Sequence, residues 1–542
     1  MKRWNIKKEY TPDSDMIRML LENRGVTTPV DVANFLNPPK ISDWINKLPV
    51  EFKSSLKKAK QLINEQIAQG NPIIVHGDYD ADGVCATAIL YQTLKKELAY
   101  DNAHYFIPNR FKHGYGLSKK SLHDLSERFQ SALLITVDSG ITAVDEVAEA
   151  QKLGFKVIIT DHHQEPVVLP NADCIVWSDE VVGSTLSWIL SRVLGSQDPY
   201  SIAFASLATI TDLQPVLGFN RSILKIGLEI INNAPPLGLK KMFEVAGRNN
   251  GRITGYDLGW VVGPRLNASG RLVEAEDSLK LLIETDENKA LEMAIKLNTV
   301  NVTRQDKTLE MFELAKGFDD TNLPKIIFSA NVDYHEGIIG LVAAKLAQKY
   351  YRPAVVVSIA DGFGKGSVRS VPGVNIIEIL REVEPLFESL GGHPMAAGFS
   401  LKVDRIPELE KMLVELAIKH IKDEHLVRSL NIDMKIPAEL VGIDFYNKII
   451  TLEPFGLGNE EPIFSSDTLT ISSADRVGRD AQHLSLKLYK DGRMYKAIWF
   501  GAGEKASDFK TGDLVEAAYS LSLNTFNGKT NIDLLIKDIR KG

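Results

Sequence analysis

Four short apolar runs stand out between residues 72 and 180, and each is rich in β-branched side chains. They are PIIVHGD, LLITVDSG, KVIITDHH and CIVWSD, and they begin at residues 72, 133, 156 and 174. Segments with apolar residues at helical spacing, such as ATAILYQTLKKEL and AVDEVAEAQKLG, lie between the first run and the third. Unbroken apolar strands that alternate with helices are typical of a parallel sheet covered on both faces. The pattern predicts an α/β domain in this part of the chain.

The remaining segments follow other patterns. Residues 1–65 have the pattern of short helices leading into a longer amphipathic one, and residues 184–246 are mostly helical in pattern. A long charged stretch at 275–316 is typical of a single connecting helix, and a second α/β unit runs through KIIFSA, GLVAAKLAQKYY and AVVVS. Near the end of the chain, five alternating runs separated by turn signals such as KDGR and FNGK predict a small β-barrel.

These patterns divide the chain into five predicted regions. The fold class is α/β, with a parallel-sheet domain and a smaller α/β domain joined by a long helix, followed by a β-barrel. The predicted regions are a helical N-terminal segment (1–65), the parallel-sheet domain (66–246), a loop with the connecting helix (247–318), the smaller α/β domain (319–425) and the barrel domain (426–542).

Length and composition are those of a soluble multidomain protein. At 542 residues the chain is long enough for about three or four domains. Its mean hydropathy is -0.08, no apolar run approaches the ~20 residues that span a bilayer, and the start MKRWNIKKEY lacks the apolar core of a signal peptide. Cys85 and Cys174 lie far apart, which excludes a disulfide framework or a thiolate zinc site and indicates a reducing cytoplasm. Together with the lack of an apolar span, this predicts a cytoplasmic protein without membrane association.

The net charge of -7 argues mildly against a nucleic-acid partner. A whole-chain sum can nevertheless conceal a local basic channel, and carboxylates that bind cations count as excess negative charge. The first sixty residues carry an excess of basic side chains, for which a solvated surface is favoured over a DNA-binding arm. Charge alone therefore decides nothing about function.

Acids and histidines follow three of the predicted strands. In a parallel α/β sheet, ligands bind at the carboxyl ends of the strands, so these side chains are expected in one crevice. Oxygen ligands together with imidazole suit Mn²⁺ or Mg²⁺, and a bridging carboxylate allows two ions to act on one phosphoryl group. The residues are His76, Asp78, Asp80 and Asp82 after the first strand, Asp138 after the second, and Asp161, His162 and His163 after the third.

Each motif also has a plainer interpretation. The spacing of Asp78, Asp80 and Asp82 resembles part of a calcium loop, but the downstream glutamate is absent and an apolar strand precedes it. Asp138, taken by itself, could equally cap a helix. Consecutive histidines after an aspartate at a strand end are harder to explain as core or surface residues. Together the three clusters favour a two-metal phosphoesterase site.

HGDYDADG, VDSG and DHH resemble the first three motifs of the DHH phosphoesterase superfamily, and ATITDLQPV resembles the fourth, which supplies Asp212. Within that superfamily the chain is similar to the RecJ family of bacterial single-strand-specific exonucleases. GPRLNASGRL, LNTVNVTRQ, YHEGIIG, GKGSVRS, GGHPMAAGF and LEPFGLGNEEPIF carry this resemblance, in the family's order, from residue 70 to the end of the chain.

The resemblance implies a role for each metal-site residue. Asp80 and Asp138, with His76, are expected to hold one ion, and Asp78 to complete or support its coordination. Asp82, Asp138, His162 and Asp212 are expected to hold the other, so that Asp138 bridges the pair. His163 is expected to contact the scissile phosphate or assist the leaving group. Asp161 is expected to orient a neighbouring histidine, because ligating imidazoles usually donate their other N–H to a carboxylate.

A second set of residues is expected to grip DNA. Arginine forks match phosphate oxygens, and glycines let main-chain N–H groups approach them. GGH alone would be a structural turn, but it resembles the glycine–histidine motif of the DHHA1 domain. For His335, a local hydrogen bond at a helix start is as good an interpretation as a DNA contact. The barrel resembles an OB-fold, although core packing is favoured over base stacking for each of Tyr495, Trp499, Phe500, Phe526 and Lys529. The expected DNA contacts are Arg265, Asn267, Arg271, Ser367, Arg369, Ser370, Gly391, Gly392 and His393.

The function that the resemblance implies is a single-stranded-DNA-specific 5′–3′ exonuclease of DNA repair and recombination, which releases 5′-mononucleotides with two Mn²⁺ or Mg²⁺ ions. It also suggests a monomer, with a RecQ-type helicase and a single-strand-binding protein as partners. The alternatives are a short-oligonucleotide or cyclic-dinucleotide phosphodiesterase and a non-catalytic DNA-binding scaffold. The terminal barrel and LEPFGLGN disfavour the first, and the complete metal motifs disfavour the second.

Overall fold

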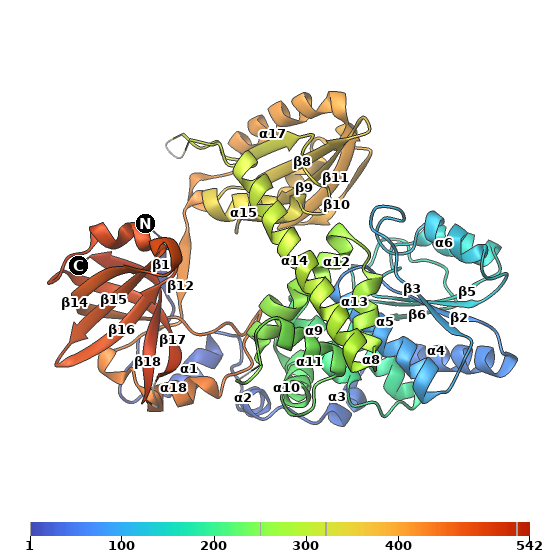
Figure 1. Ribbon diagram of the computed structural model, residues 1–542, viewed down its shortest axis with the longest axis horizontal. Helices are drawn as coiled ribbons and strands as arrows, with labels where there is room; N and C mark the ends of the chain where they lie inside the picture. Colours follow the sequence, from blue (N-terminus) through green and yellow to red (C-terminus); the bar gives the residue numbers. More distant parts are fainter. Residues whose placement is uncertain (1, 250, 320–321, 527–528, 542) are drawn as a thin grey trace. The chain divides into compact units, whose positions relative to one another are not determined.

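The computed structural model describes residues 2–249, 251–319, 322–526 and 529–541 (Figure 1). The chain forms two compact units. The smaller unit contains residues 1–44, 215–222 and 429–542, and the larger contains residues 45–214 and 223–428. No helix in the described ranges is long and apolar enough to cross a membrane.

The larger unit begins with a five-stranded parallel sheet in the order β3-β2-β4-β5-β6. The central strands β2 and β4 are entirely buried, because their unbroken Ile, Leu and Val side chains face apolar layers on both sides. As predicted, the three strands that end in acids and histidines are neighbours. The strands are β2 (Ile73–His76), β3 (Ala103–Phe106), β4 (Leu133–Val137), β5 (Lys156–Asp161) and β6 (Cys174–Trp177).

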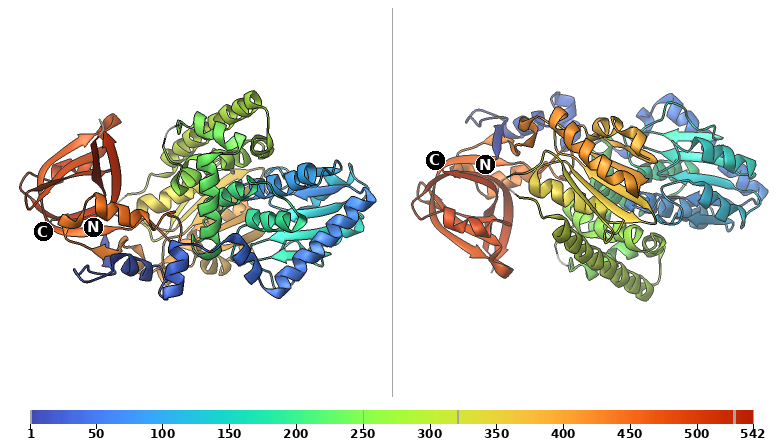
Figure 2. Two further views of the ribbon diagram at one scale, coloured as in Figure 1. Left: turned by 90° about the horizontal axis from the view of Figure 1, so that it is seen from below. Right: turned by 90° about the horizontal axis from the view of Figure 1, so that it is seen from above.

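Helices surround this sheet and continue beyond it (Figure 2). The helices α5, α8 and α9 are buried along nearly their whole length, since they pack against one another, and α5 and α8 also pack against the sheet. The helices of this region are α4 (Val50–Gln69), α5 (Ala81–Gln92), α6 (Lys119–Ser126), α7 (Val144–Lys152), α8 (Gly183–Leu194), α9 (Ser201–Thr211), α10 (Gly218–Asn233) and α11 (Leu237–Val245).

Two local features differ from the sequence prediction. The edge strand β3 was not expected, because AHYF is only half buried and lacks an unbroken apolar run. The long helix predicted over 275–316 is interrupted: α13 (Glu276–Ile283) ends, and α14 (Glu287–Ala315) begins anew. The Asp286 carboxylate accepts a hydrogen bond from Lys289 N, so this residue caps α14 instead of continuing a helix.

The second sheet of the larger unit is mixed, in the order β10-β11-β9-β8-β7. The predicted β–α–β unit is present as β7, α15 and β8, and β8 and β9 form an antiparallel hairpin. The elements are α12 (Gly263–Leu272), β7 (Ile327–Asn331), α15 (Ile339–Tyr350), β8 (Ala354–Ala360), β9 (Phe363–Arg369), α16 (Ile376–Arg381), β10 (Ser389–His393), β11 (Ala396–Lys402) and α17 (Ile406–His420).

The smaller unit contains the predicted five-stranded barrel. Strands follow the order β14-β15-β16-β18-β17, and β17 pairs back with β14, so the sheet is closed (Figure 2). The KDGR turn is present, whereas the FNGK turn falls largely on residues 527–528, outside the described residues. The strands are β14 (Phe464–Val477), β15 (His483–Lys490), β16 (Arg493–Trp499), β17 (Leu514–Phe526) and β18 (Lys529–Lys541), with α18 (Ile443–Ile450) beside them.

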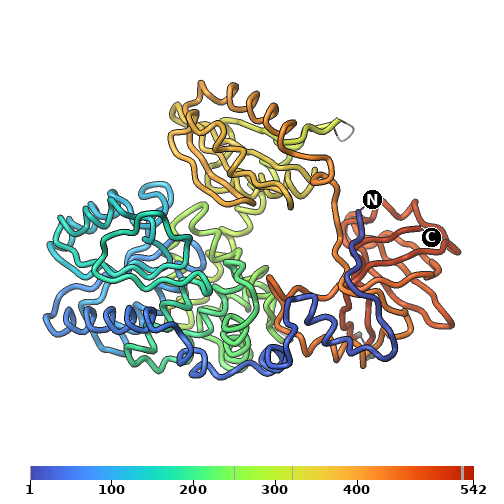
Figure 3. Tube along the Cα trace, turned by 180° about the vertical axis from the view of Figure 1, so that it is seen from behind, coloured from blue at the N-terminus to red at the C-terminus, as the bar shows by residue number. Residues whose placement is uncertain are grey.

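A purely helical segment was expected for residues 1–65, but the structure also contains a strand there. β1 (Arg3–Ile6) pairs in parallel with β12 (Ser429–Ile432), more than 400 residues away, and the two lie side by side in Figure 3. α1 (Met16–Glu22) and α2 (Pro29–Leu36) then pack apolar side chains into the core of the barrel unit, and α3 (Ile41–Lys47) follows. The chain's first residues therefore complete a domain formed mostly by its last ones.

A buried arginine joins three separate segments of the smaller unit. Arg221 donates hydrogen bonds to the carbonyl oxygens of Phe35 at 2.8 Å, Glu453 at 2.7 Å and Pro454 at 3.2 Å. Its guanidinium also lies over the Phe35 ring, 3.8 Å from the centroid. One side chain thus connects α2, the first turn of α10 and the loop before the barrel.

Replacement of Arg221 by methionine should lower the stability of the smaller unit. Three carbonyl groups would lose a charged donor, and we expect a loss of about 3 kcal/mol in the free energy of unfolding. Calorimetry of the intact protein measures this. The control is Arg18→Met, since Arg18 is an exposed arginine of the same unit that pairs with its neighbour Glu22 on α1. Equal stability of the two variants would contradict this role of Arg221.

Candidate metal centre and nucleic-acid contacts

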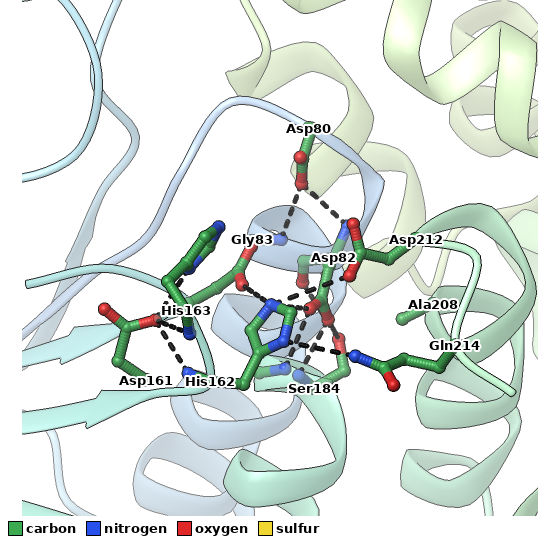
Figure 4. A network of polar contacts seen from close by, with 12 residues as sticks. Asp80, Asp82, Gly83, Asp161, His162, His163, Ser184, Ala208, Asp212 and Gln214 are labelled. Atoms are coloured by element: carbon green, nitrogen blue, oxygen red, sulfur yellow. Dashed lines mark hydrogen bonds and ion pairs between the residues drawn. The ribbon is translucent and has the colours of Figure 1, made fainter. Parts of the chain in front are cut away.

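The ends of three strands and one helix bring the predicted acids and histidines together (Figure 4). Asp80 and Asp82 follow β2, Asp138 follows β4, and His162 follows β5, while Asp212 caps the end of α9. All but Asp80 and Asp212 are buried. Four stretches of chain far apart in sequence therefore contribute to one polar cluster.

Three overlapping groups in this cluster could hold metal ions. In each group, the potential ligand atoms lie within 4.8 Å of one another. Asp138 belongs to two groups, and its Oδ1 lies 3.0 Å from His162 Nε2, which in turn lies 3.5 Å from Asp82 Oδ2 and 3.6 Å from Asp212 Oδ2. The groups are Asp78–Asp80–Asp138, Asp82–His162–Asp212 and Asp138–His162–His163.

Asp138 has a left-handed backbone conformation, with φ at 61°. Such a conformation is unfavourable for a residue with a side chain and is concentrated at functional sites. The backbone N–H of Asp138 donates to the Thr160 carbonyl oxygen at 2.9 Å. The next helix, α7, begins only at Val144, so Asp138 does not cap a helix. The strained backbone therefore belongs to a residue at the centre of the cluster.

The start of α8 holds Asp82. The backbone N–H groups of Gly183 and Ser184 donate to its carboxylate at 2.8 and 2.7 Å, and the Ser184 hydroxyl donates at 2.5 Å. The first N–H groups of a helix lack partners within it and favour negative charge. Neither Gly183 nor Ser184 was identified from the sequence, because GST at a helix start carries no sign of a partner about 100 residues earlier.

Asp80 is held in a similar way by its own helix. It caps α5, and its Oδ1 accepts hydrogen bonds from Asp82 N at 3.0 Å and Gly83 N at 3.1 Å. The Asn267 side chain accepts a hydrogen bond from Ala81 N at 2.7 Å, so α12 supports the same loop. Asn267, expected to contact DNA, thus has a structural contact to the metal loop.

The electrostatics of the cluster favour a bound cation. Burial raises the pKa of Asp78, Asp138 and Asp212, and repulsion from neighbouring carboxylates raises each of them further. Burial also lowers the pKa of His162, which favours the neutral imidazole that can bind a metal. Among the described residues, no hydrogen bond reaches Asp78 Oδ1. The donor set fits divalent cations that prefer oxygen and imidazole ligands.

His76 has different surroundings from the other predicted ligands. It is buried at the end of β2, with its ring stacked on Phe106 and its Nε2 3.3 Å from the Ser121 hydroxyl. Its Nδ1 receives no hydrogen bond from a described residue, yet none of the three groups includes it. A role of His76 in metal binding stays a prediction.

Asp161 contacts His163, the second of the two histidines. Asp161 Oδ1 lies 2.8 Å from His163 Nδ1 and accepts the backbone N–H groups of both His162 and His163. Burial alone would lower the pKa of His163, but the hydrogen bond and charge of Asp161 raise it to about 9. On its other side, His163 Nε2 lies 3.0 Å from the Tyr115 hydroxyl. His163 is therefore held between a carboxylate and a phenol, and Tyr115 was not identified from the sequence.

Arginines gather beside the metal loop. Burial, together with the positive charges of Arg110, Arg304 and Arg369, lowers the pKa of Arg271 to about 10, so these three guanidinium groups lie near that of Arg271. Arg110 also lies over the Tyr79 ring, 5.1 Å from its centroid. Arg110 and Arg304 were not among the expected contacts, since isolated arginines in PNRF and VTRQ show no clustering in sequence. A group of like charges that is partly removed from water favours an anion that balances it.

The other expected DNA contacts lie in several environments. Arg265 donates to Asn298 at 3.0 Å and to the Val261 carbonyl oxygen at 2.6 Å. Arg369 Nη1 lies 3.2 Å from the Ser367 hydroxyl, whereas the buried Ser370 hydroxyl donates to the Val374 carbonyl oxygen. Gly391, Gly392 and His393 are exposed on the edge strand β10. Ser370 thus has a structural hydrogen bond, and the edge strand remains accessible.

Three residues left open by the sequence have clear positions. His335 Nδ1 accepts a hydrogen bond from Gly337 N at 3.1 Å, which is the local bond considered above. In the barrel, Tyr495 belongs to the core, whereas the Phe500 side chain is 60% exposed and its ring contacts His483 edge to face. The side chains of Phe526 and Lys529 are outside the described structure.

Three family models match the chain: the DHH family N-terminal domain over residues 72–210, the DHHA1 domain over 323–419, and the RecJ OB domain over 432–538. The chain is 32% identical to the single-stranded-DNA-specific exonuclease RecJ of Bacillus subtilis strain 168, across 99% of this chain and 70% of that protein. It is also 32% identical to RecJ of Thermus thermophilus, across 90% and 71%. The crystal structure of that RecJ with Mn²⁺ matches at a TM-score of 0.82 and 28% identity, covering 100% of this chain and 80% of that one.

The approach of α8 to Asp138 gives a test of the geometry. A Cβ built on Gly183 would lie 2.6 Å from Asp138 Cβ and 2.8 Å from its Oδ1, so Gly183→Ala should displace the carboxylate. We expect the affinity for Mn²⁺, measured by calorimetric titration, to fall by at least about tenfold. Gly317→Ala is the control, because a Cβ there meets no atom within 4 Å. Unchanged Mn²⁺ binding by Gly183→Ala would contradict the arrangement.

Proposed function

Because this chain belongs to the RecJ family of single-stranded-DNA-specific exonucleases, we propose that it hydrolyses single-stranded DNA with divalent cations held at the aspartate–histidine cluster. The observation that carries the proposal is the position of Asp138, whose carboxylate lies between two groups of potential ligands. Two cations bound there would activate a water molecule and offset the charge that develops on the phosphoryl group. Mn²⁺ and Mg²⁺ are the proposed ions.

The groups of potential ligands support most of the ligand roles that we propose. We propose Asp78, Asp80 and Asp138 for one ion, with His76 as a further ligand, and Asp82, His162, Asp212 and Asp138 for the other. Backbone N–H groups at the starts of α5 and α8 fix the orientation of Asp80 and Asp82. His163, held by Asp161, would donate a hydrogen bond to the scissile phosphate.

The arginine cluster would bind the DNA backbone. Arg110, Arg271, Arg304 and Arg369 place four positive charges beside the loop that carries Asp80, which matches a phosphate held next to the metal centre. Arg265 and Ser367 would extend this contact, and Gly391, Gly392 and His393 offer exposed backbone and one ring for a strand on β10. Asn267 and Ser370 would act by supporting their neighbours, because their side chains bind protein backbone.

Finer features rest on the family alone. We propose attack from the 5′ end, release of 5′-mononucleotides, and a role in DNA repair and recombination. A cytoplasmic monomer that acts with a RecQ-type helicase and a single-strand-binding protein would fit this role. The regions 66–246 and 319–425 would form the catalytic and substrate-binding domains, and 426–542 a barrel domain for single strands.

Loss of the bridging carboxylate should abolish cleavage. With Mn²⁺, the wild-type protein should release labelled mononucleotides at once from 5′-labelled single strands and only late from 3′-labelled ones. Asp138→Ala should reduce the rate by at least about a thousandfold because both ions lose a ligand, and EDTA should do the same. Asp145→Ala, on the surface of α7, is the matched control. Rapid hydrolysis of dinucleotides with no action on long strands would instead indicate an oligonucleotide hydrolase, and tight binding without cleavage would indicate a scaffold.

Salt should weaken DNA binding steeply if arginine–phosphate contacts dominate. The logarithm of the affinity should fall linearly with the logarithm of the salt concentration, and Arg271→Gln should reduce that slope by about one, as one phosphate contact is lost. Arg405→Gln, which removes an exposed arginine paired with Glu408, should leave the slope unchanged. Fluorescence anisotropy at several salt concentrations gives the slopes. Identical slopes for wild type and Arg271→Gln would argue against the arginine cluster as a phosphate site.

A further inference from the structure

Two large aromatic side chains project from the larger unit close to the metal centre. Tyr256 is 67% exposed and Trp260 is 71% exposed. Their rings are 6.3 Å apart between centroids and nearly parallel, with 26° between the planes. Removing such rings from water lowers the free energy. An exposed stacked pair therefore indicates a surface that binds something flat and apolar.

The backbone beneath the pair is firmly anchored. The residue after Tyr256, Asp257, is buried, accepts hydrogen bonds from Thr254 N and Oγ1 at 2.8 and 3.0 Å, and pairs with Arg248 at 2.7 Å. The next residue, Leu258, and Val262 one turn later are both buried. The aromatic rings are thus held outward by a segment whose other face is fixed, and they do not belong to a loose loop.

The same segment packs against the end of α9, which supplies Asp212. A Cβ on Gly259, next to Trp260, would lie 2.8 Å from Ile210 Cγ2. A Cβ on Gly263 would lie 2.3 Å from Thr211 Cγ2. These contacts are with the two residues that immediately precede Asp212. The aromatic pair therefore stands beside the last turn of the helix that ends in the metal centre.

The segment also continues directly into the helix that reaches the metal loop. Trp260 lies in a π-helical turn (Asp257–Val262) that runs directly into α12, and Asn267 is seven residues further along the chain. Asn267 accepts the N–H of Ala81 beside Asp80. Arg265 and Arg271 lie on the same helix. Aromatic rings, arginines and metal ligands thus follow one another along one stretch of structure.

We propose that Tyr256 and Trp260 form a base-stacking platform, which holds bases of the single strand close to the metal centre. The inference rests on the proposed function and assigns it a contact that neither the motifs nor the DNA residues above include. Aromatic side chains stack on the face of any base, so the platform would bind without sequence preference. The arginines would hold the phosphates of the same strand.

The platform would also favour single strands over duplex. In a duplex, the face of each base is already stacked on its neighbours, so the rings have nothing to bind unless the helix opens. A flexible single strand can turn its bases onto the rings. The aromatic pair would thereby contribute to substrate choice through the chemistry of the bases, independently of the width of any passage.

Binding measurements test the platform directly. Trp260→Ala and Tyr256→Ala should each weaken binding of labelled oligo(dT), measured by anisotropy in EDTA so that no cleavage occurs, by at least about fivefold. Trp260→Phe should retain most of the affinity because the ring face remains. Tyr200→Ala is the matched control, since Tyr200 is an exposed tyrosine at the opposite end of α9. Oligo(dT) should also quench the tryptophan fluorescence of the wild type more than that of Trp260→Phe.

Abasic strands separate stacking from a purely structural effect. A single abasic position, moved along the strand, should weaken wild-type binding where it falls on the platform. The same abasic position should not lower the affinity of Trp260→Ala any further. If the wild type cleaves single strands while both alanine variants bind oligo(dT) as tightly as it does, the platform is wrong and the proposed function stands. If the wild type cleaves no single strand at all, the proposed function itself fails. Full binding of oligo(dT) by the alanine variants, with loss of a protein partner instead, would also overturn the stacking proposal.

Discussion

The crowding of carboxylates at the ends of β2, β4 and α9 is the constraint on which the rest of this structure depends. Burial and mutual repulsion raise the pKa of Asp78, Asp138 and Asp212, so the folded chain holds these groups at a cost that it must offset. Part of the compensation is local, because the first N–H groups of α5 and α8 donate to Asp80 and Asp82. The remainder fits bound cations. The left-handed backbone of Asp138 and the glycine at position 183 follow from the same need, because both bring main chain closer to this cluster than an ordinary residue would allow.

Much of this centre could be predicted from sequence because it lies at strand ends. Apolar runs identify the strands, parallel topology aligns their carboxyl ends, and the polar residues that follow must then meet. The groups that support the centre follow no such rule. Gly183 reaches Asp82 from a helix start 101 residues later, and Arg110 and Arg304 meet Arg271 from a loop and a distant helix. A single arginine or glycine has no periodicity, so only the folded chain shows what it contacts.

The errors in secondary structure have a similar origin. β3 has a half-buried edge position, and its sequence AHYF therefore lacks the pattern of a central strand. β1 is stabilised by pairing with β12 across more than 400 residues, a contact that no local window contains. The break before α14 could have been predicted locally. Thr285 and Asp286 form a typical helix start within an otherwise helix-prone stretch, and Asp286 caps α14. Long-range pairing and capping thus decided the structure where hydrophobic periodicity was weak or misleading.

The negative net charge, which argued mildly against nucleic acid, is explained by where the charges lie. Several of the excess carboxylates are concentrated in the metal centre, where bound cations would cancel or reverse their field. The arginines, in contrast, converge at one place, and the pKa of Arg271 is lowered because burial removes it from water and its arginine neighbours repel its charge. A phosphate backbone would supply the balancing charge, and its bases would need apolar partners nearby. On these proposals, charge would select the backbone, whereas exposed rings would respond to whether the bases are free. A sum over the whole chain contains neither kind of information, because both depend on which side chains the fold brings to one surface.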